Sequence, residues 1–155
     1  MNESVLLVED EENDVFFMRI AFERAQVKNP LVVASDGREA ISYLNGDGKF
    51  GDRHAHPVPG LVLLDLRLPQ VPGMEVLRWI RQQPSLNHLP VIVCSSSCQD
   101  SDVKTAHRLG ASAYIVKPSR PAELLEVVRR IKQGWLDADR PPSEWQDWLS
   151  IAVGS

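Results

Sequence analysis

With 155 residues, of which 43% are hydrophobic and 25% charged, the chain has the length and composition of one soluble globular domain. Its apolar runs are much shorter than the roughly 18 residues that a membrane span needs, and a net charge of −4 argues against a direct nucleic-acid partner. No basic region precedes the first apolar run, so we expect no secretory signal, no membrane contact and a cytoplasmic protein. Two cysteines, Cys94 and Cys98, are too few for a disulfide framework.

Five short apolar runs recur along the chain, and each is typical of a strand buried on both faces, as in parallel sheets covered by helices. They predict strands at 5–8, 31–34, 61–64, 91–94 and 113–116. Apolar residues at spacings of three and four predict helices at about 13–27, 36–45, 74–83, 100–109 and 119–131, and residues 45–60 predict a long loop. This alternation predicts an α/β fold with a five-stranded parallel sheet, doubly wound, with helices on both faces.

Polar residues and a proline mark where some of these elements begin. Asn13 and Asp14 could cap the first helix, and Asp36 and Glu39 have the spacing of a capping box at the start of the second. The pair Pro72-Gly73 forces a turn after the third strand.

The strand at 61–64 ends on Asp65, and other strands also end on polar side chains. Glu9 and Asp10 follow the first strand, Ser95 the fourth and Lys117 the fifth. The carboxyl ends of parallel strands meet at one edge of a sheet, where ligands bind in open α/β folds. Taken alone, Asp65 could equally be a turn or helix-cap residue. The combination predicts an edge that carries three carboxylates, a hydroxyl and an ammonium group.

Three carboxylates at one edge repel one another unless a cation lies between them. Mg²⁺, or Mn²⁺ in its place, suits such a site because it prefers oxygen ligands and leaves positions open for phosphate oxygens. Lys117 and Ser95 would complete a cradle for a phosphoryl group. Asp65 could then act as the nucleophile, because a carboxylate can take up a phosphoryl group as an acyl phosphate.

Four motifs in this order resemble those of the receiver domain of two-component response regulators, over roughly residues 3–133. They are Val8-Glu9-Asp10, Leu64-Asp65-Leu66-x-Leu68-Pro69-x-x-x-Gly73, Ser95 and Lys117-Pro118, with Ser95 30 residues and Lys117 52 residues beyond Asp65. The resemblance implies a flavodoxin-like receiver domain over residues 1–134, which accepts a phosphoryl group on Asp65 from a sensor histidine kinase. Phosphorylation would switch a protein–protein interaction, with no enzyme activity beyond autophosphorylation and autodephosphorylation.

The resemblance also implies a role for each residue of the edge. Asp10 and Asp65 would bind the metal directly, Glu9 through a water molecule and Arg67 through its backbone carbonyl. Lys117 would pair with the phosphoryl group, and the Lys117–Pro118 bond is usually cis in the family. A plain surface lysine is the competing interpretation of Lys117.

Ser95 and Tyr114 match the two switch residues of the family. The Ser95 hydroxyl would turn toward the new phosphoryl group, and the Tyr114 ring would move inward as the output face rearranges. Ser95 could instead cap the following helix, and Tyr114 could be a half-buried strand residue with a solvated hydroxyl.

Arg67 departs from the simplest expectation for this motif. It stands two residues beyond Asp65, near the route by which water would reach an acyl phosphate. Its side chain could clamp the phosphate, pair with Glu9 or exclude the water. We hypothesise that Arg67, jointly with Ser97, sets the lifetime of the phosphorylated state.

Three features resemble the small stand-alone response regulators associated with bacterial phytochromes. They are the long loop 45–60, the phenylalanines of the first helix and a C-terminal extension that bears tryptophans. The resemblance implies a bacterial phytochrome as the kinase. The extension, 135–155, could fold back on its own domain or, as we expect, support a homodimer through Trp135, Trp145, Trp148 and Leu149.

Two other classes of function compete with this interpretation. A Mg²⁺-dependent phosphohydrolase also uses an Asp nucleophile after a buried strand, but it usually has a second Asp two residues on, where this chain has Arg67. The other is a receiver-like scaffold that no longer takes up phosphate, and the full set of acids, with Ser95 and Lys117, argues against it.

Overall fold

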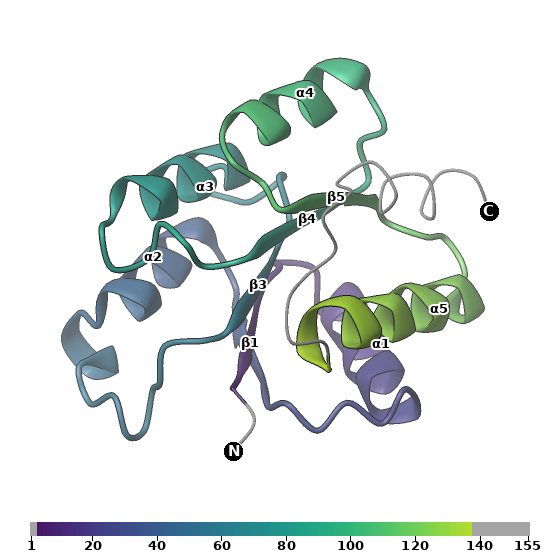
Figure 1. Cartoon of the computed structure of the whole chain (residues 1–155), viewed down its shortest axis with the longest axis horizontal. Helices are drawn as coiled ribbons and strands as arrows, with labels where there is room; N and C mark the ends of the chain where they lie inside the picture. Colours follow the sequence, from purple (N-terminus) through teal and green to yellow (C-terminus); the bar gives the residue numbers. More distant parts are fainter. Residues whose placement is uncertain (1–2, 138–155) are drawn as a thin grey trace.

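The computed structural model describes residues 3–137, in which a sheet of five parallel strands lies between two layers of helices (Figure 1). The strands are β1 (Val5–Val8), β2 (Leu31–Ala34), β3 (Leu61–Leu64), β4 (Val91–Ser95) and β5 (Ala113–Val116), in the spatial order β2-β1-β3-β4-β5. The helices are α1 (Glu12–Arg24), α2 (Gly37–Asn45), α3 (Gly73–Gln82), α4 (Asp100–Arg108) and α5 (Pro121–Ile131), with a short 3-10 helix η1 (Gly48–Phe50) and a π-helical segment η2 (Lys132–Leu136). The predicted flavodoxin-like, doubly wound α/β fold is confirmed.

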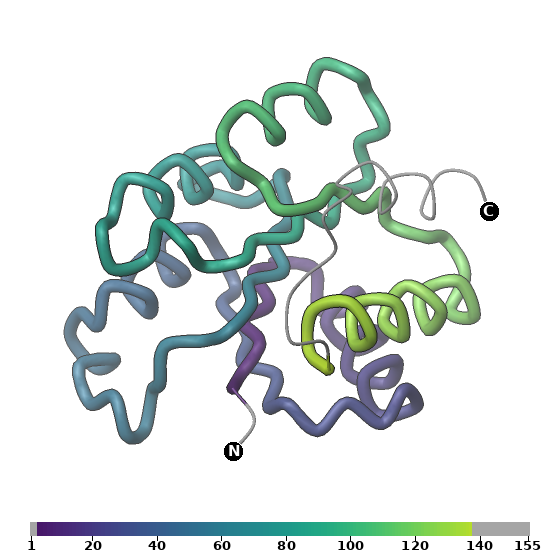
Figure 2. Tube along the Cα trace, viewed as in Figure 1, coloured from purple at the N-terminus to yellow at the C-terminus, as the bar shows by residue number. Residues whose placement is uncertain are grey.

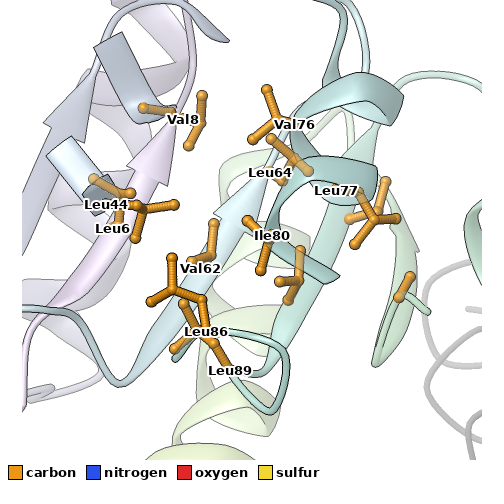
Figure 3. Close-up of a cluster of buried hydrophobic side chains, with 14 of the residues drawn as sticks. Leu6, Val8, Leu44, Val62, Leu64, Val76, Leu77, Ile80, Leu86 and Leu89 are labelled. Carbon is orange, nitrogen blue, oxygen red and sulfur yellow. The ribbon is translucent and has the colours of Figure 1, made fainter. Parts of the chain in front are cut away.

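The strands carry apolar side chains on both faces, which is why they stand out in the sequence as unbroken hydrophobic runs. Because alternate residues of a strand point to opposite faces, each strand contributes to two separate clusters. The cluster beneath α2, α3 and α4 includes Leu6, Val8, Val62, Leu64, Val76, Leu77 and Ile80 (Figure 3). The cluster beneath α1 and α5 includes Leu7, Met18, Phe22, Leu63, Val128 and Ile131. Figure 2 shows the purple trace of α1 and the yellow-green trace of α5 side by side on this second face.

The order of the strands reverses between β1 and β3. The chain runs from β1 outward to β2 and then crosses back to β3. In doubly wound sheets, ligands bind at this reversal, beyond the carboxyl ends of the strands. Val8 of β1 is in register with Leu64 of β3, so the residues that follow them, Glu9 and Asp65, emerge next to each other.

Helix α1 begins differently from the sequence prediction. Asn13 and Asp14 do not cap it, because the helix already starts at Glu12 and its N-cap is Glu11. The Glu11 N–H donates to a Glu9 carboxylate oxygen at 3.1 Å, so the chain turns into the helix directly after the strand end. Asp14 therefore lies inside the first turn of α1, with its carboxylate free to contact another element.

Helix α2 begins with the predicted capping box, since the Glu39 N–H donates to the Asp36 carboxylate at 2.7 Å. It ends against the loop 45–60, which contains η1 and is tied to the helix by one arginine. Arg53 donates hydrogen bonds of 2.8, 2.7 and 2.9 Å to the backbone carbonyl groups of Tyr43, Leu44 and His56. The long loop is therefore anchored to the C-terminus of α2.

The last helix continues through the predicted domain boundary at residue 134, because η2 extends α5 to Leu136. Trp135 and Leu136 pack against the apolar cluster beneath α1 and α5. Trp135, predicted to belong to the extension, thus packs against the receiver core, whereas Trp145, Trp148 and Leu149 lie outside the described residues. Within residues 3–137, the helices are too short or too polar to cross a bilayer.

Candidate functional site

Two buried carboxylates lie where the strand order reverses. Glu9 follows β1 and Asp65 follows β3, and the two residues are 3% and 5% exposed. The Glu9 N–H donates to the Ala34 carbonyl at 3.0 Å. The Asp65 N–H donates to the Val8 carbonyl at 3.1 Å. Continued strand pairing therefore fixes the backbone of both acids at this edge.

Asp10 completes an acidic cluster with these two residues. One carboxylate oxygen from each of Glu9, Asp10 and Asp65 lies within 4.8 Å of the others. Both Glu9 oxygens already accept a hydrogen bond, one from the Glu11 N–H and one from Lys117. The exposed Asp10 side chain forms no hydrogen bond or ion pair within the described part of the chain. These oxygen donors are of the kind that Mg²⁺ and Mn²⁺ prefer.

The ammonium group of Lys117 lies among three carboxylates. Its Nζ is 2.7 Å from Glu9 Oε2, 2.9 Å from Asp14 Oδ2 and 3.2 Å from Asp65 Oδ2. The backbone N–H of Lys117 donates to the Ser95 carbonyl at 2.8 Å, which places the start of the β5–α5 connection beside the end of β4. The interpretation of Lys117 as a plain surface lysine is wrong, because the side chain is only 21% exposed and is fully engaged.

Four carboxylates share this edge with one ammonium group, so negative charge is in excess. Burial raises the pKa of Glu9 to about 7; the charge of Asp65 acts in the same direction, and the hydrogen bond from Lys117 opposes both. Burial disfavours the charged form of Lys117, but hydrogen bonds with Glu9 and Asp14 outweigh it and raise the pKa of the ammonium group. Lys117 therefore keeps its proton, and a divalent cation would relieve the remaining repulsion.

Ser95 is fully buried at the end of β4. Its hydroxyl accepts a hydrogen bond from the Ser97 N–H at 3.2 Å. Ser95 does not cap the following helix, because the N-cap of α4 is Gln99. The structure brings Ser95 to the same edge as Asp65 and Lys117.

Tyr114 is fully buried in β5, with its ring in the cluster beneath α2, α3 and α4. Its hydroxyl donates to the Ser97 carbonyl at 2.7 Å, so the interpretation as a half-buried tyrosine with a solvated hydroxyl is wrong. The Ser97 hydroxyl donates in turn to the carboxylate of Asp102 in α4. Burial raises the pKa of Tyr114, which keeps this hydroxyl protonated as a donor. A chain of contacts thus connects the end of β4 to β5 and α4.

Arg67 contacts the site through its backbone. Its N–H donates to Asp65 Oδ1 at 3.3 Å. The side chain is exposed and forms no ion pair within residues 3–137; Glu9 is not its partner, because that carboxylate is held by Glu11 and Lys117. The Lys117–Pro118 bond is trans, unlike the family expectation, and the long lysine side chain still reaches the carboxylates.

The loop after Asp65 is packed closely against two helix starts. A Cβ atom on Gly73, at the start of α3, would lie 2.2 Å from the Asp65 carbonyl oxygen. A Cβ atom on Gly37, at the start of α2, would lie 2.2 Å from the Val71 carbonyl oxygen. Both helices can approach the loop only because these positions lack a side chain. Sequence reasoning used Gly73 as part of a motif but did not explain it.

A pocket of about 300 Å³ opens beside Lys117, between α1 and the start of α5. Its apolar lining includes Phe17, Met18, Pro118, Pro121 and Leu124. Asp14, Asp65 and Lys117 line it as well, so the pocket adjoins the acidic cluster. Sequence reasoning did not identify Asp14 as part of the site. Its place in the first turn of the helix that directly follows Glu9 and Asp10 was the available signal.

Comparisons with known proteins agree with this geometry. Residues 5–129 match the response regulator receiver domain family. The response regulator Rcp1 of Synechocystis sp. (strain ATCC 27184 / PCC 6803 / Kazusa) is 32% identical over 139 residues, which are 90% of this chain and 92% of Rcp1. The crystal structure of the Mn²⁺-bound form of Rcp1 has a TM-score of 0.80 at 31% identity, over 91% of this chain and 99% of that chain.

Two further solved structures are similar over most of both chains. The phosphorylated cyanobacterial phytochrome response regulator RcpA is 33% identical with a TM-score of 0.84, over 92% of this chain and 100% of that chain. The response regulator RPA3017, from red light signalling of R. palustris, is 34% identical with a TM-score of 0.85, over 92% of this chain and 99% of that chain. The strand-end acids, the lysine and the fold lead to the same conclusion as these matches: the chain belongs to the response regulator receiver domain family.

Proposed function

We propose that this chain is a response regulator that accepts a phosphoryl group on Asp65 from a sensor histidine kinase and switches a protein–protein interaction. The contact between Lys117 and Asp65 carries the proposal: a buried carboxylate has an ammonium group 3.2 Å away and two further acids beside it. Phosphorylation of an aspartate with the help of a metal is typical of the family.

The acidic cluster fits Mg²⁺ or Mn²⁺. Asp10 and Asp65 would bind the ion directly, and the backbone carbonyl of Arg67 would add a ligand. Asp10 supports this assignment because its carboxylate has no other partner within residues 3–137. Glu9 would act through a water molecule, which fits the hydrogen bonds that both of its oxygens already accept. The ion would neutralise negative charge on the acids and on the phosphoryl group, and Rcp1 offers a relative with bound Mn²⁺.

Transfer needs one nucleophile and one donor of hydrogen bonds. An oxygen of Asp65 attacks the phosphorus of the kinase phosphohistidine, and the P–N bond breaks as the imidazole leaves with the electron pair. Lys117 binds an oxygen of the phosphoryl group and donates no proton to it, since the raised pKa of its ammonium group keeps it charged. The product is an aspartyl phosphate.

The switch would use the contacts around Ser97. In this structure the Ser95 hydroxyl accepts a hydrogen bond from the Ser97 N–H. When the hydroxyl turns toward the phosphoryl group, this hydrogen bond breaks. Ser97 is held by Tyr114 and Asp102, so a shift at Ser97 changes the contacts of β5 and α4. The output face of the proposal is therefore the surface near Tyr114 and α4.

The lifetime of the phosphorylated state would depend on Arg67 and Ser97. The Arg67 side chain is exposed and without an ion-pair partner within the described residues, so it is available to clamp the phosphoryl group or exclude water. Autodephosphorylation of Arg67→Ala should therefore be faster than that of the unmodified chain. An unchanged rate would refute this role.

A bacterial phytochrome is the kinase that we propose, with a homodimer as the assembly. RcpA is named as a phytochrome response regulator and RPA3017 as part of red light signalling, which supports the light-sensing partner. The homodimer rests on the interpretation of Trp145, Trp148 and Leu149 as interface residues, and a cytoplasmic location stays a prediction.

Labelling with radioactive acetyl phosphate and Mg²⁺ tests the function. We expect one alkali-labile acyl phosphate per chain, and no label in Asp65→Asn. Asp47→Asn is a matched control, because Asp47 is an exposed acid at the start of η1 and is not part of the acidic cluster, so its replacement should leave labelling unchanged. Release of phosphate without stable label would indicate a phosphohydrolase, and neither label nor turnover would indicate a scaffold.

A further inference from the structure

Lys117 has one carboxylate partner that the acidic cluster does not include. Asp14 belongs to the first turn of α1, and its Oδ2 lies 2.9 Å from Lys117 Nζ. The three acids that lie within 4.8 Å of one another are Glu9, Asp10 and Asp65, so Asp14 lies outside the group that would hold a metal. It also lines the apolar pocket beside Lys117.

All three N–H donors of the Lys117 ammonium group face carboxylates, at 2.7, 2.9 and 3.2 Å. A phosphoryl oxygen needs one of them. The Asp65 contact is the longest, and it would weaken further when Asp65 becomes an acyl phosphate, because the uncharged oxygens of this mixed anhydride are poorer acceptors than a carboxylate. The N–H of Lys117 that faced Asp65 can then donate a hydrogen bond to a phosphoryl oxygen.

The two remaining partners differ in what phosphorylation does to them. Glu9 is part of the cluster that would hold the metal, so its charge is shared with the ion. Asp14 lies outside that cluster, so it would neither bind the metal nor take up the phosphoryl group. It is the partner that can hold the ammonium group in place while the other contacts rearrange.

We propose that Asp14 is a positioning residue, which keeps the Lys117 ammonium group aimed at the phosphoryl group during transfer to Asp65. The inference rests on the proposed function. Transfer from acetyl phosphate forms a P–O bond to Asp65 and breaks the P–O bond to acetate, which leaves with the electron pair. Asp14 acts only through Lys117 and touches neither the donor nor the phosphoryl group.

The Asp14 side chain is 45% exposed, so solvent screens its charge and the effect is modest. We expect Asp14→Asn to lower the maximal labelling rate about threefold to fivefold, as for a partly exposed ion pair. The acetyl phosphate concentration for half-maximal rate should not change, because the substitution alters positioning and not donor binding.

Glu12→Gln is the matched control. Glu12 is an acid in the same first turn of α1, and its exposed side chain contacts no lysine within the described residues. It therefore reports the general effect of removing one negative charge near the start of a helix. Melting curves establish that each variant is folded, and Asp14→Glu, which keeps the charge, should restore most of the rate.

The experiment measures labelling rates of the full chain with acetyl phosphate and Mg²⁺, over a range of donor concentrations. A fall in the maximal rate of Asp14→Asn that Glu12→Gln does not share supports the proposal. Equal rates, a faster Asp14→Asn, a fall shared by both variants, or a change in the half-maximal concentration alone would each overturn it. Failure to label the unmodified chain would instead refute the proposed function itself.

Discussion

The Tyr114 hydroxyl donates a 2.7 Å hydrogen bond to the backbone carbonyl of Ser97, and the tyrosine is fully buried. The bond joins the middle of β5 to the loop between β4 and α4. Ser97 lies two residues beyond Ser95, so a movement of this loop would either break the hydrogen bond or move the Tyr114 ring with it. The inward ring is therefore coupled to the end of β4 in this structure.

Tyr114→Phe should lower the free energy of unfolding by about 1–2 kcal/mol, because it leaves the buried Ser97 carbonyl without its partner. Urea unfolding measures this. Tyr43→Phe is the control, since the Tyr43 hydroxyl also donates to a backbone carbonyl, that of Pro57, at 3.0 Å. Only Tyr114→Phe should also change the lifetime of the acyl phosphate, and equal lifetimes in the two variants would contradict a role in switching.

Gly73→Ala should destabilise the protein by about 1–3 kcal/mol, in the range of overpacked sites. The new Cβ atom would lie 2.2 Å from the Asp65 carbonyl oxygen, so either α3 or the Asp65 backbone must move. We expect slower phosphorylation as well as a lower melting temperature. Gly51→Ala is the control, because its Cβ atom would come no closer than 3.3 Å to a neighbour. Wild-type behaviour of Gly73→Ala would show that the loop is looser than the structure indicates.

Magnesium should stabilise the folded chain, since an ion that binds only the native state adds about 2.7 kcal/mol at a hundred times its Kd. Thermal unfolding with and without Mg²⁺ gives the shift. Asp10→Asn should abolish the shift. Glu23→Gln, an exposed acid of α1 outside the acidic cluster, should keep it. Stabilisation that survives Asp10→Asn would place the ion elsewhere.

The two cysteines should react very differently with a thiol reagent at pH 8. Cys98 is exposed, whereas Cys94 is buried and its pKa is raised by burial to about 12. One thiol per folded chain should therefore react, and Cys98→Ser should remove that reaction until denaturant is added.

Above pH 9 the unfolded state loses the Cys94 proton and the native state keeps it, so the free energy of unfolding should fall as the pH rises toward 12. Rapid labelling of two thiols in the native protein would contradict this burial.

A chain that ends at Asp137 tests the predicted dimer, because it keeps Trp135 in its place against the core. We expect the full chain to elute from gel filtration as a dimer and the shortened chain as a monomer. Replacing Trp145 and Trp148 by serine in the full chain should have the same effect. A dimer of unchanged size after truncation would rule out residues 138–155 as its main support.

Much of this arrangement could be predicted from the sequence because strand burial leaves a strong signal. Runs such as Leu61–Leu64 are apolar on both faces, so a polar residue directly after such a run, such as Asp65, is conspicuous. Strand ends also fix Glu9, Asp65 and Lys117 relative to one another, since parallel pairing brings them to one edge.

The remaining features depend on contacts between distant segments, which no local pattern reports. Asp14 lies in the first turn of α1, directly after the hydrogen bond between the Glu11 N–H and the Glu9 carboxylate, and there it reaches Lys117. Arg53 anchors its loop to α2 through carbonyl groups that any residue would offer. Tyr114 is buried in the cluster that also contains Ala106 of α4, and the short run Ala113–Val116 could not show which side chains the helices would cover.

The residues of the site have contacts on both faces of the sheet. Lys117 and Asp14 open toward α1 and α5, whereas the contacts of Ser97 lead to α4 on the other face (Figure 1). A protein bound over α1 would therefore not compete for space with one bound over α4. Donor and target could occupy the domain simultaneously, so release of the first need not precede recognition of the second.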